Sequence, residues 1–328
     1  MAPYKNSLAA VVIIASVITT SPISSVYAAD EGTDVAYNVA KQDWTFGSMT
    51  GYFDRAQLQR GYKVYKEVCS ACHGMKFMYF RNLSQPGGPE FSAEQTEAIA
   101  ASVEVEDGPN EEGAMFMRPA KPSDKFPLRF KNDKEAAAAN NGAVPPDLSL
   151  MAKARTVETH SAWYMFPVNM VTDLATQYQE AGPDYIHALL TGYDDIPSYQ
   201  RDGSGRLTQV KAGETVPNAE QCVAVQRGEG SDPDVCTPLG DGLNYNRVYP
   251  GHQIAMVNPL SDGVVDYEDG TPATLDNYSK DVTAYLMWSS EPKLEERKKL
   301  GLKVLLYLII LTGLLYLSKR ALWRDVEH

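Results

Sequence analysis

Residues 60–81 read RGYKVYKEVCSACHGMKFMYFR, and the pentapeptide CSACH at residues 69–73 has the pattern C-x-x-C-H. This pattern is the attachment signature of c-type haem. Cys69 and Cys72 can add to the two vinyl groups of a haem, and His73 can then ligate the iron. A thioredoxin-like redox pair would lie near a βαβ pattern, which is not seen, and a zinc site needs a second close pair of ligands. We therefore predict one covalently bound haem c, with His73 as the proximal ligand.

The chain on both sides of this motif predicts two helices. Asp54 is a suitable N-cap for a helix that leads into the motif, with apolar residues at helical spacing. Gly61 interrupts its apolar stripe, which indicates a close approach by another helix. A second, amphipathic helix is expected after Thr274, with its apolar residues on one face: Leu275, Tyr278, Val282, Tyr285 and Leu286. Two such crossing helices form the frame of a class I cytochrome c, so the expected fold class is mainly α.

The second axial ligand of the iron is not fixed by the pentapeptide. Methionine or histidine could supply it, and most methionines of the chain are expected to fill the core. Met256 lies in an irregular segment, residues 251–259, ahead of the second helix, where a loop could cross the opposite haem face. His252 lies in the same segment and remains the alternative, although position favours Met256.

The N-terminal residues 1–28 are typical of a secretory signal peptide. Lys5 supplies the positive charge, an apolar stretch follows it, and Val26-Tyr27-Ala28 suits cleavage after Ala28, with Ala29 as the alternative. The apolar stretch is shorter than a membrane-spanning helix requires. We therefore expect the body of the protein, residues 29–292, to be exported into the periplasm, an oxidising compartment.

The C-terminal residues 293–328 predict a membrane anchor. Residues 304–317 read VLLYLIILTGLLYL, an apolar run followed by Lys319 and Arg320. With Lys303 and the flanking leucines this run reaches membrane length, and apolar character on every face disfavours a buried core helix. If the body is exported, a single span places the short basic tail in the cytoplasm, as the positive-inside rule expects.

The charge of the chain restricts its partners. The 328 residues carry a net charge of −12, and residues 29–292 alone carry 21 basic and 38 acidic side chains, a net charge of −17. So acidic a body excludes nucleic acid as a partner, because phosphate contacts need a basic surface. The acidic runs at residues 104–112 and 262–269 could attract a basic soluble protein; a solvated face with no partner is the alternative.

The remaining cysteines, Cys222 and Cys236, are expected to pair in an oxidising compartment. Residues 201–244 around them are rich in Gly, Asp and Pro, which indicates a surface loop that a disulfide would constrain. Two free thiols are the alternative.

With these motifs in order, the chain from residue 44 to residue 323 resembles the cytochrome c1 family, the haem subunits of the cytochrome bc1 complex (ubiquinol–cytochrome c oxidoreductase). The resemblance is closest to bacterial members. The pentapeptide alone would indicate any cytochrome c, whereas the other segments together are specific to this family. These segments are MRP at 117–119, NNGAVPPDLSLMAKAR at 140–155, DYIHALLTGY at 184–193, IAM at 254–256, YEDGTPATLDNYSKDVTAYLMWSSEP at 267–292 and the C-terminal anchor.

The resemblance implies roles for further residues. It assigns Met256 as the second axial ligand of the iron. It implies that Arg155 pairs with a haem propionate, which needs a charged donor. It also implies that the haem is walled by the following residues: Tyr185, Asn140, Pro145 and Pro146.

The resemblance also implies a function. A cytochrome c1 takes one electron from the Rieske iron–sulfur protein and passes it to cytochrome c, in a complex that contains cytochrome b and is expected to be homodimeric. It is a subunit of an enzyme and is not catalytic as an isolated chain. The alternative is a membrane-anchored haem sensor or assembly subunit without electron turnover.

Two parts depart from the short mitochondrial pattern. Residues 156–182 are an insertion, and its aromatic Trp163, Tyr164 and Phe166 are expected to pack on the body or on a neighbouring subunit. The stretch around Cys222 and Cys236 is also longer, and it resembles bacterial members that carry a disulfide there.

Overall fold

The computed structural model describes residues 39–48, 50–155, 163–168, 170–171, 181–211, 213–214, 216–230 and 232–324. The expected signal peptide, residues 1–28, lies outside the described residues. The α-helices are α1 (Arg55–Glu67), α2 (Ala93–Ala101), α3 (Asp133–Ala139), α4 (Met151–Ala154), α6 (Gly182–Leu190), α7 (Leu275–Ser290) and α8 (Leu294–Leu322). Short 3₁₀ turns are η2 (Cys69–Ala71), η3 (Phe80–Ser84), η4 (Trp163–Met165) and η5 (Pro250–His252).

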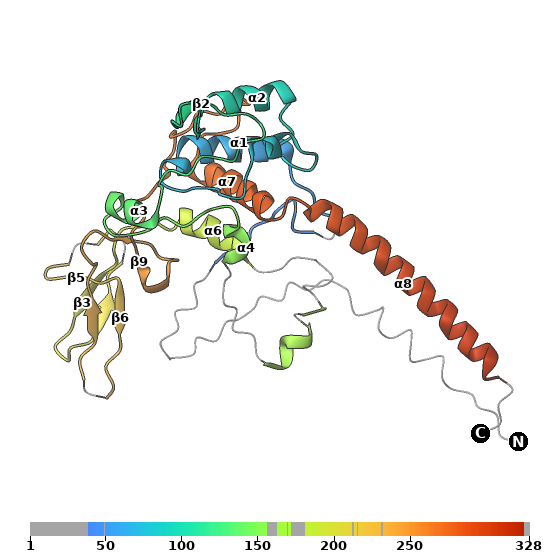
Figure 1. Cartoon of the computed structure of the whole chain (residues 1–328). Coiled ribbons are helices and arrows are strands. Elements are labelled where there is room, and N and C mark those ends of the chain that lie inside the picture. Colours follow the sequence, from blue (N-terminus) through green and yellow to red (C-terminus); the bar gives the residue numbers. More distant parts are fainter. Residues whose placement is uncertain are drawn as a thin grey trace, which may run out of the picture. The chain divides into compact units, whose positions relative to one another are not determined.

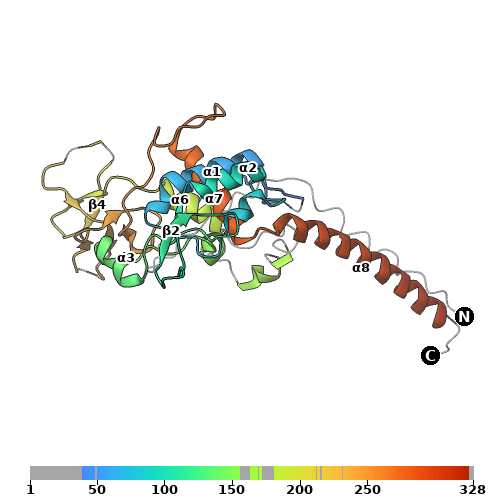
Figure 2. The ribbon, with the colours of Figure 1, turned by 45° about the horizontal axis from the view of Figure 1, so that its top comes forward.

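The helix α1, which leads into the pentapeptide, packs along α7 (Figures 1 and 2). Asp54 caps α1 as predicted, because its side chain accepts hydrogen bonds from the N–H groups of Ala56 and Gln57. Gly61 lies at the contact between the two helices. A Cβ atom there would lie 2.0 Å from the backbone oxygen of Asp281, so only glycine allows this approach. The close contact inferred from Gly61 is confirmed.

The helix α7 begins after its N-cap Thr274, as expected, but it is not buried on one face alone. Every residue from Asp281 to Ser289 is buried, polar residues included. Four of the five apolar residues expected on one face, Tyr278, Val282, Tyr285 and Leu286, are buried, and polar neighbours such as Asp281 are buried with them. The carboxylate of Asp281 is tolerated inside because Arg60 of α1 donates to both of its oxygens, at 2.8 Å and 3.2 Å.

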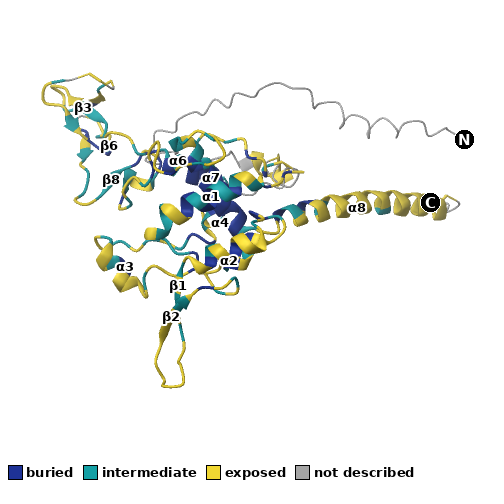
Figure 3. Ribbon diagram, turned by 90° about the horizontal axis from the view of Figure 1, so that it is seen from above, coloured by how far each residue is buried: buried dark blue, intermediate teal, exposed yellow. Residues whose placement is uncertain are grey.

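Aromatic side chains fill the space between α1 and α7. The rings of Tyr62 and Tyr65 lie 5.8 Å and 5.9 Å from the ring of Tyr285, whose neighbour on the same helix is the buried Trp288. Figure 3 shows α1 and α7 as the buried centre of the fold. Large aromatic contacts of this kind supply much of the energy that holds such a core together.

Short strands lie between the helices. They are β1 (Glu104–Asp107), β2 (Phe116–Pro119), β3 (Ser198–Arg201), β4 (Leu207–Gln209), β5 (Glu220–Gln221), β6 (Ala224–Gln226), β7 (Val235–Thr237), β8 (Asn244–Tyr245) and β9 (Gln253–Ile254). All of their pairings are antiparallel, in the pairs β1–β2, β6–β7 and β8–β9 and the three-stranded order β4-β3-β5. The predicted surface loop around the second cysteine pair therefore contains small sheets.

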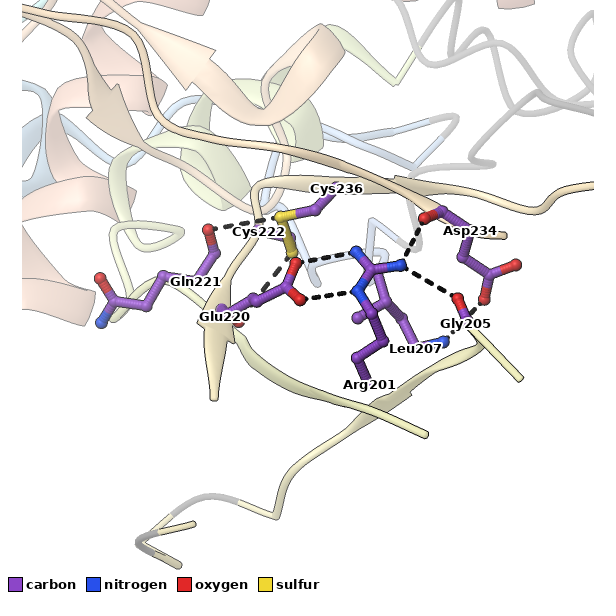
Figure 4. The surroundings of a disulfide bond; sticks show 8 residues. All are labelled: Arg201, Gly205, Leu207, Glu220, Gln221, Cys222, Asp234 and Cys236. Carbon is purple, nitrogen blue, oxygen red and sulfur yellow. Dashed lines mark hydrogen bonds and ion pairs between the residues drawn. A yellow bond between two sulfur atoms is a disulfide. The ribbon is translucent and has the colours of Figure 1, made fainter. Parts of the chain in front are cut away.

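A disulfide joins Cys222 and Cys236, with an S–S distance of 2.01 Å (Figure 4). Beside it, Arg201 forms a bidentate ion pair with Glu220 at 2.7 Å and 2.9 Å. The same guanidinium donates to the backbone oxygens of Gly205 and Asp234. This region is therefore held by polar contacts and one covalent bond as well as by its few apolar side chains.

The helix α8 is the one helix of the described residues that is long and apolar enough to cross a membrane, with a mean hydropathy of 2.2 over its most apolar window. Its apolar part is exposed along its length (Figure 3). The helix begins at Leu294, before the apolar run that predicted it.

The first turns of α8 pack against the N-terminal segment that leads into α1. The carboxylate of Glu295 accepts from the N–H of Phe53 at 2.9 Å and pairs with Arg55 at 2.6 Å. Lys298 is only 2% exposed, and its ammonium donates to the backbone oxygens of Phe46 and Ser48. We call these contacts the anchor junction.

The structure is mostly helical and has one long apolar C-terminal helix, as expected for a mainly α fold with a C-terminal anchor. Of the insertion at residues 156–182, only residues 163–168, 170, 171, 181 and 182 are described. Tyr164 and Phe166 are 65% and 66% exposed, so they do not pack into the core.

Candidate haem site

The pentapeptide forms a tight turn at the end of α1. The N–H groups of Cys72 and His73 both donate to the backbone oxygen of Cys69, at 3.2 Å and 2.9 Å. This turn, η2, brings the two thiols and the imidazole to one place. Cys69 and Cys72 are free thiols, whereas the chain's other two cysteines form the disulfide.

His73 is held in a single orientation by Pro146. Its Nδ1 lies 2.8 Å from the backbone oxygen of Pro146. A carbonyl oxygen can only accept, so Nδ1 carries the proton and Nε2 presents its lone pair. Burial lowers the pKa of His73, which favours this neutral form. A metal-ligating histidine characteristically has its second nitrogen fixed in this way.

The segment after the Pro-Pro pair is bound along the segment after the pentapeptide. The side chain of Asp147 accepts from the N–H of Lys76 at 2.7 Å, and Ser149 Oγ accepts from the N–H of Phe77 at 3.2 Å. The N–H of Leu148 adds a bond to the backbone oxygen of Gly74 at 2.9 Å. The sequence analysis assigned no role to Asp147 or Ser149. A side chain that can accept hydrogen bonds, directly after a rigid Pro-Pro pair, is the pattern that could have indicated these contacts.

An open recess lies next to Cys72. Apolar side chains form much of it, including Leu128, Phe130 and Pro145. A Cβ atom at Gly74 would lie 2.9 Å from Leu128 Cδ2, so glycine keeps this space open. The charged residues Lys76, Arg129 and Asp147 complete the lining. Apolar side chains beside the Cys72 thiol, next to the oriented imidazole of His73, fit a covalently attached haem.

The surroundings of the Cys69 sulfur also fit a covalently attached haem. Cys69 packs against the hydrophobic core, and burial raises the pKa of its thiol to about 12. A site that disfavours thiolate suits an uncharged sulfur, whether it is a thiol or a thioether.

Of the other expected haem-wall residues, Tyr185 is buried on α6 and belongs to the hydrophobic core. Asn140 is the C-cap of α3, and its Nδ2 donates to the backbone oxygen of Ala136 at 2.7 Å. Ala136 also lines the recess, so α3 reaches it, together with Pro145. Pro146 contributes its backbone to His73 and its ring is exposed.

Arg155 follows the short helix α4 as its C-cap and is exposed. Its guanidinium makes no ion pair with any residue that the structure describes. Arg155 is not among the residues that line the recess beside Cys72, so its pairing with a propionate stays a prediction.

Met256 is half-buried and packs against the same hydrophobic core as Cys69. Its backbone oxygen accepts a hydrogen bond from the hydroxyl of Tyr193 at 3.0 Å. The ring of the alternative ligand, His252, lies 5.9 Å from that of Tyr245, and its Nδ1 lies 3.4 Å from the backbone oxygen of Asn246. Tyr193 had no role in the sequence analysis beyond its place in a family segment.

The two acidic runs differ in how many charges they leave free. In residues 262–269, Asp269 pairs with Arg60 at 2.7 Å, Glu268 with Lys63 at 3.4 Å, and Asp262 accepts from a backbone N–H. In residues 104–112, which include β1, exposed glutamates predominate and ion pairing is confined to Asp107. The glutamates of that run that form no ion pair with a described residue are Glu104, Glu106, Glu111 and Glu112, of which Glu112 accepts a hydrogen bond from Asn110 Nδ2 at 3.2 Å.

The chain matches the Cytochrome C1 family over residues 44–326. It is 40% identical over 314 residues to cytochrome c1 of Rhodospirillum rubrum, and the match covers 95% of this chain and 97% of that protein. It is also 40% identical over 288 residues to cytochrome c1 of Blastochloris viridis, covering 87% of this chain and 86% of that protein.

A third relative is longer. Over 297 residues the chain is 44% identical to a Bradyrhizobium diazoefficiens protein named cytochrome b/c1. That match covers 90% of this chain and 37% of the relative, so the chain spans little more than a third of that protein's length.

Proposed function

The chain belongs to the cytochrome c1 family, and from this premise we propose that it is the electron-transfer subunit of a membrane-bound quinol–cytochrome c oxidoreductase. Members of the family carry a covalently bound haem c and transfer electrons within the bc1 complex. The observation that carries the proposal is the free C-x-x-C-H motif whose His73 is oriented by the Pro146 carbonyl at 2.8 Å.

The proposed residue roles follow from the donor groups. When bound, haem c supplies a reversible one-electron couple at its iron. Cys69 and Cys72 would hold it through thioether bonds, His73 Nε2 and Met256 Sδ would ligate the iron, and Arg155 would pair with a propionate. A methionine thioether favours reduced iron and raises the potential, which suits a carrier late in a respiratory chain.

We place the electron donor and acceptor by charge and by chemistry. The donor is the Rieske iron–sulfur protein, and the acceptor is a basic cytochrome c. The hairpin β1–β2 is the better docking surface for the acceptor, because the glutamates of residues 104–112 are largely unpaired whereas the carboxylates of residues 262–269 are largely engaged.

The proposed topology has three parts. Residues 1–28 are a signal peptide, residues 29–292 a periplasmic haem domain, and residues 293–328 an anchor with a short cytoplasmic tail. The apolar helix α8 supports the anchor. Cytochrome b is the proposed neighbour of α8, supported by a relative whose name combines cytochromes b and c1, and the complex is proposed to be a homodimer.

The assembly is tested by purification in mild detergent through a tag after residue 328. Haem staining and mass spectrometry should recover a haem-bearing chain of this sequence together with cytochrome b and an iron–sulfur subunit. Recovery of the haem-bearing chain without either of them contradicts the proposal.

The axial ligand is tested by spectroscopy of the purified, haem-loaded protein. Oxidised haem with a methionine ligand has a weak far-red band, which should vanish in Met256→Ala and persist in a His252→Ala control. Rapid carbon monoxide binding by the unsubstituted ferrous protein would instead indicate an open ligand position and a sensor.

A further inference from the structure

We propose that Tyr193 is a positioning residue for the axial methionine: its hydroxyl, bonded to the Met256 backbone oxygen at 3.0 Å, holds the ligand loop in the conformation that ligates the iron. The proposal rests on the proposed role of Met256 as axial ligand. Tyr193 does not touch the reacting atoms itself and acts through the loop that carries the sulfur.

The loop that carries Met256 has a fixed base. Asn246 is fully buried, and its Nδ2 donates to the backbone oxygen of Leu189 at 2.8 Å. Its Oδ1 accepts from the backbone N–H groups of Val248 and Tyr249, at 3.0 Å and 3.1 Å. The N–H of Arg247 donates to the backbone oxygen of Gly192 at 3.0 Å. Both acceptors lie at the end of α6, so the base of the loop is attached to this helix.

The far side of the loop depends on a different contact. Beyond β9, which ends at Ile254, the backbone at Met256 is bonded to Tyr193, a residue only one position after Gly192. The end of α6 therefore holds the loop at its base through Gly192 and Leu189 and at the ligand through Tyr193. Because the tyrosine bond is at the ligand residue itself, it is the one that bears on where the sulfur lies.

The chemistry of Tyr193 suits a permanent donor. Its ring is half-buried, and burial raises the pKa of its phenol above the ordinary value, so the hydroxyl keeps its proton. A backbone oxygen accepts this proton in a hydrogen bond whatever the redox state of the iron. The contact therefore favours the ligated loop over a displaced one without adding a charge.

The test compares Tyr193→Phe with Tyr249→Phe in the full-length, haem-loaded protein. Both changes remove one hydroxyl and keep the ring. Tyr249 lies in the same region of the chain, and its hydroxyl bonds to no residue that the structure describes. Imidazole is titrated into the oxidised protein at a temperature where all variants are folded, and the far-red band and the midpoint potential are recorded.

For Tyr193→Phe we expect imidazole to bind about fivefold more tightly, which corresponds to about 1 kcal/mol, the net contribution of a typical hydrogen bond. The far-red band should weaken and the midpoint potential should fall, with Tyr249→Phe equal to the unsubstituted protein. Equal imidazole affinities in all three proteins, or equal shifts in both variants, would overturn the proposal. A Met256→Leu variant tests the axial role of Met256 separately from the positioning role of Tyr193. If this variant keeps the far-red band, the axial role of Met256 itself is wrong.

Discussion

Replacement of Gly61 by alanine should separate α1 from α7. The added Cβ would lie 2.0 Å from the Asp281 oxygen, 2.7 Å from its carbon and 2.8 Å from Tyr285 Cβ. Two of these three atoms belong to the backbone of α7, at the start of its continuously buried stretch, so no flexible side chain can move aside. The helices must therefore move apart by more than an ångström, which disturbs the Arg60–Asp281 pair and the aromatic contacts.

The expected change in the free energy of unfolding is the balance of two effects. Overpacking of a core costs about 1–3 kcal/mol and occasionally more, and contact with a buried backbone places this site at the upper end. Alanine recovers about 1 kcal/mol of helix propensity relative to glycine. We expect a net loss of about 2 kcal/mol, which lowers the melting temperature by about 4–8 °C for a domain of this size.

The assay is thermal unfolding of the detergent-solubilised full-length protein, followed by fluorescence of the buried Trp288 as it separates from the core. Gly203→Ala is the matched control, because a Cβ atom there meets nothing within 4 Å. Its melting temperature should equal that of the unsubstituted protein. A Gly61→Ala protein that melts within 1 °C of the control would refute the reasoning about this helix contact.

Three further predictions follow from charge, pH and covalent constraint. Glutamine at Glu104 and Glu106 should slow electron transfer to a basic cytochrome c at low salt and flatten its dependence on ionic strength, measured by stopped-flow; Asn at the internally paired Asp269 should have less effect. The hydrogen bond from Arg118 holds the pKa of Asp124 at about 2, below its value in the unfolded chain, so its stabilising effect is full above about pH 4 and is lost as the pH falls towards 2. Asp124→Asn should therefore reduce the acid-induced loss of stability in this range in pH-dependent melting curves, whereas an unchanged slope contradicts the assignment. Serine at both Cys222 and Cys236 should destabilise the region around them by up to about 3 kcal/mol, seen as faster proteolysis there, and unchanged cleavage would show that the polar contacts suffice.

The features that sequence could predict are those with a local signal. The C-x-x-C-H spacing, the Asp54 cap and the apolar tail helix are all contained in a few consecutive residues. Gly61 is the instructive case: a glycine inside an apolar stripe predicted a close helix contact, and the atoms 2.0–2.8 Å from its would-be Cβ confirm that contact.

Features that depend on distant partners escaped the sequence. Asp281 is a buried carboxylate of α7, and its partner Arg60 lies 221 residues away. Tyr193 and Met256 are 63 residues apart. The strands β3 to β9 are two to four residues long, too short to show the alternation by which strands are recognised. In each case the reason for the structure lies in a contact that no window of sequence contains.

The anchor junction also bears on the order in which the protein is made. Lys298 bonds to Phe46 across 252 residues of sequence, and Glu295 bonds to Phe53 across 242. A ribosome therefore completes the first partners of these bonds long before the second ones exist. Until the start of α8 has emerged, the carbonyl groups of residues 46 and 48 have no ammonium to bind. Completion of the fold is thus tied to delivery of the membrane helix, and a chain truncated before residue 294 would lack the contacts that close its own N-terminal segment.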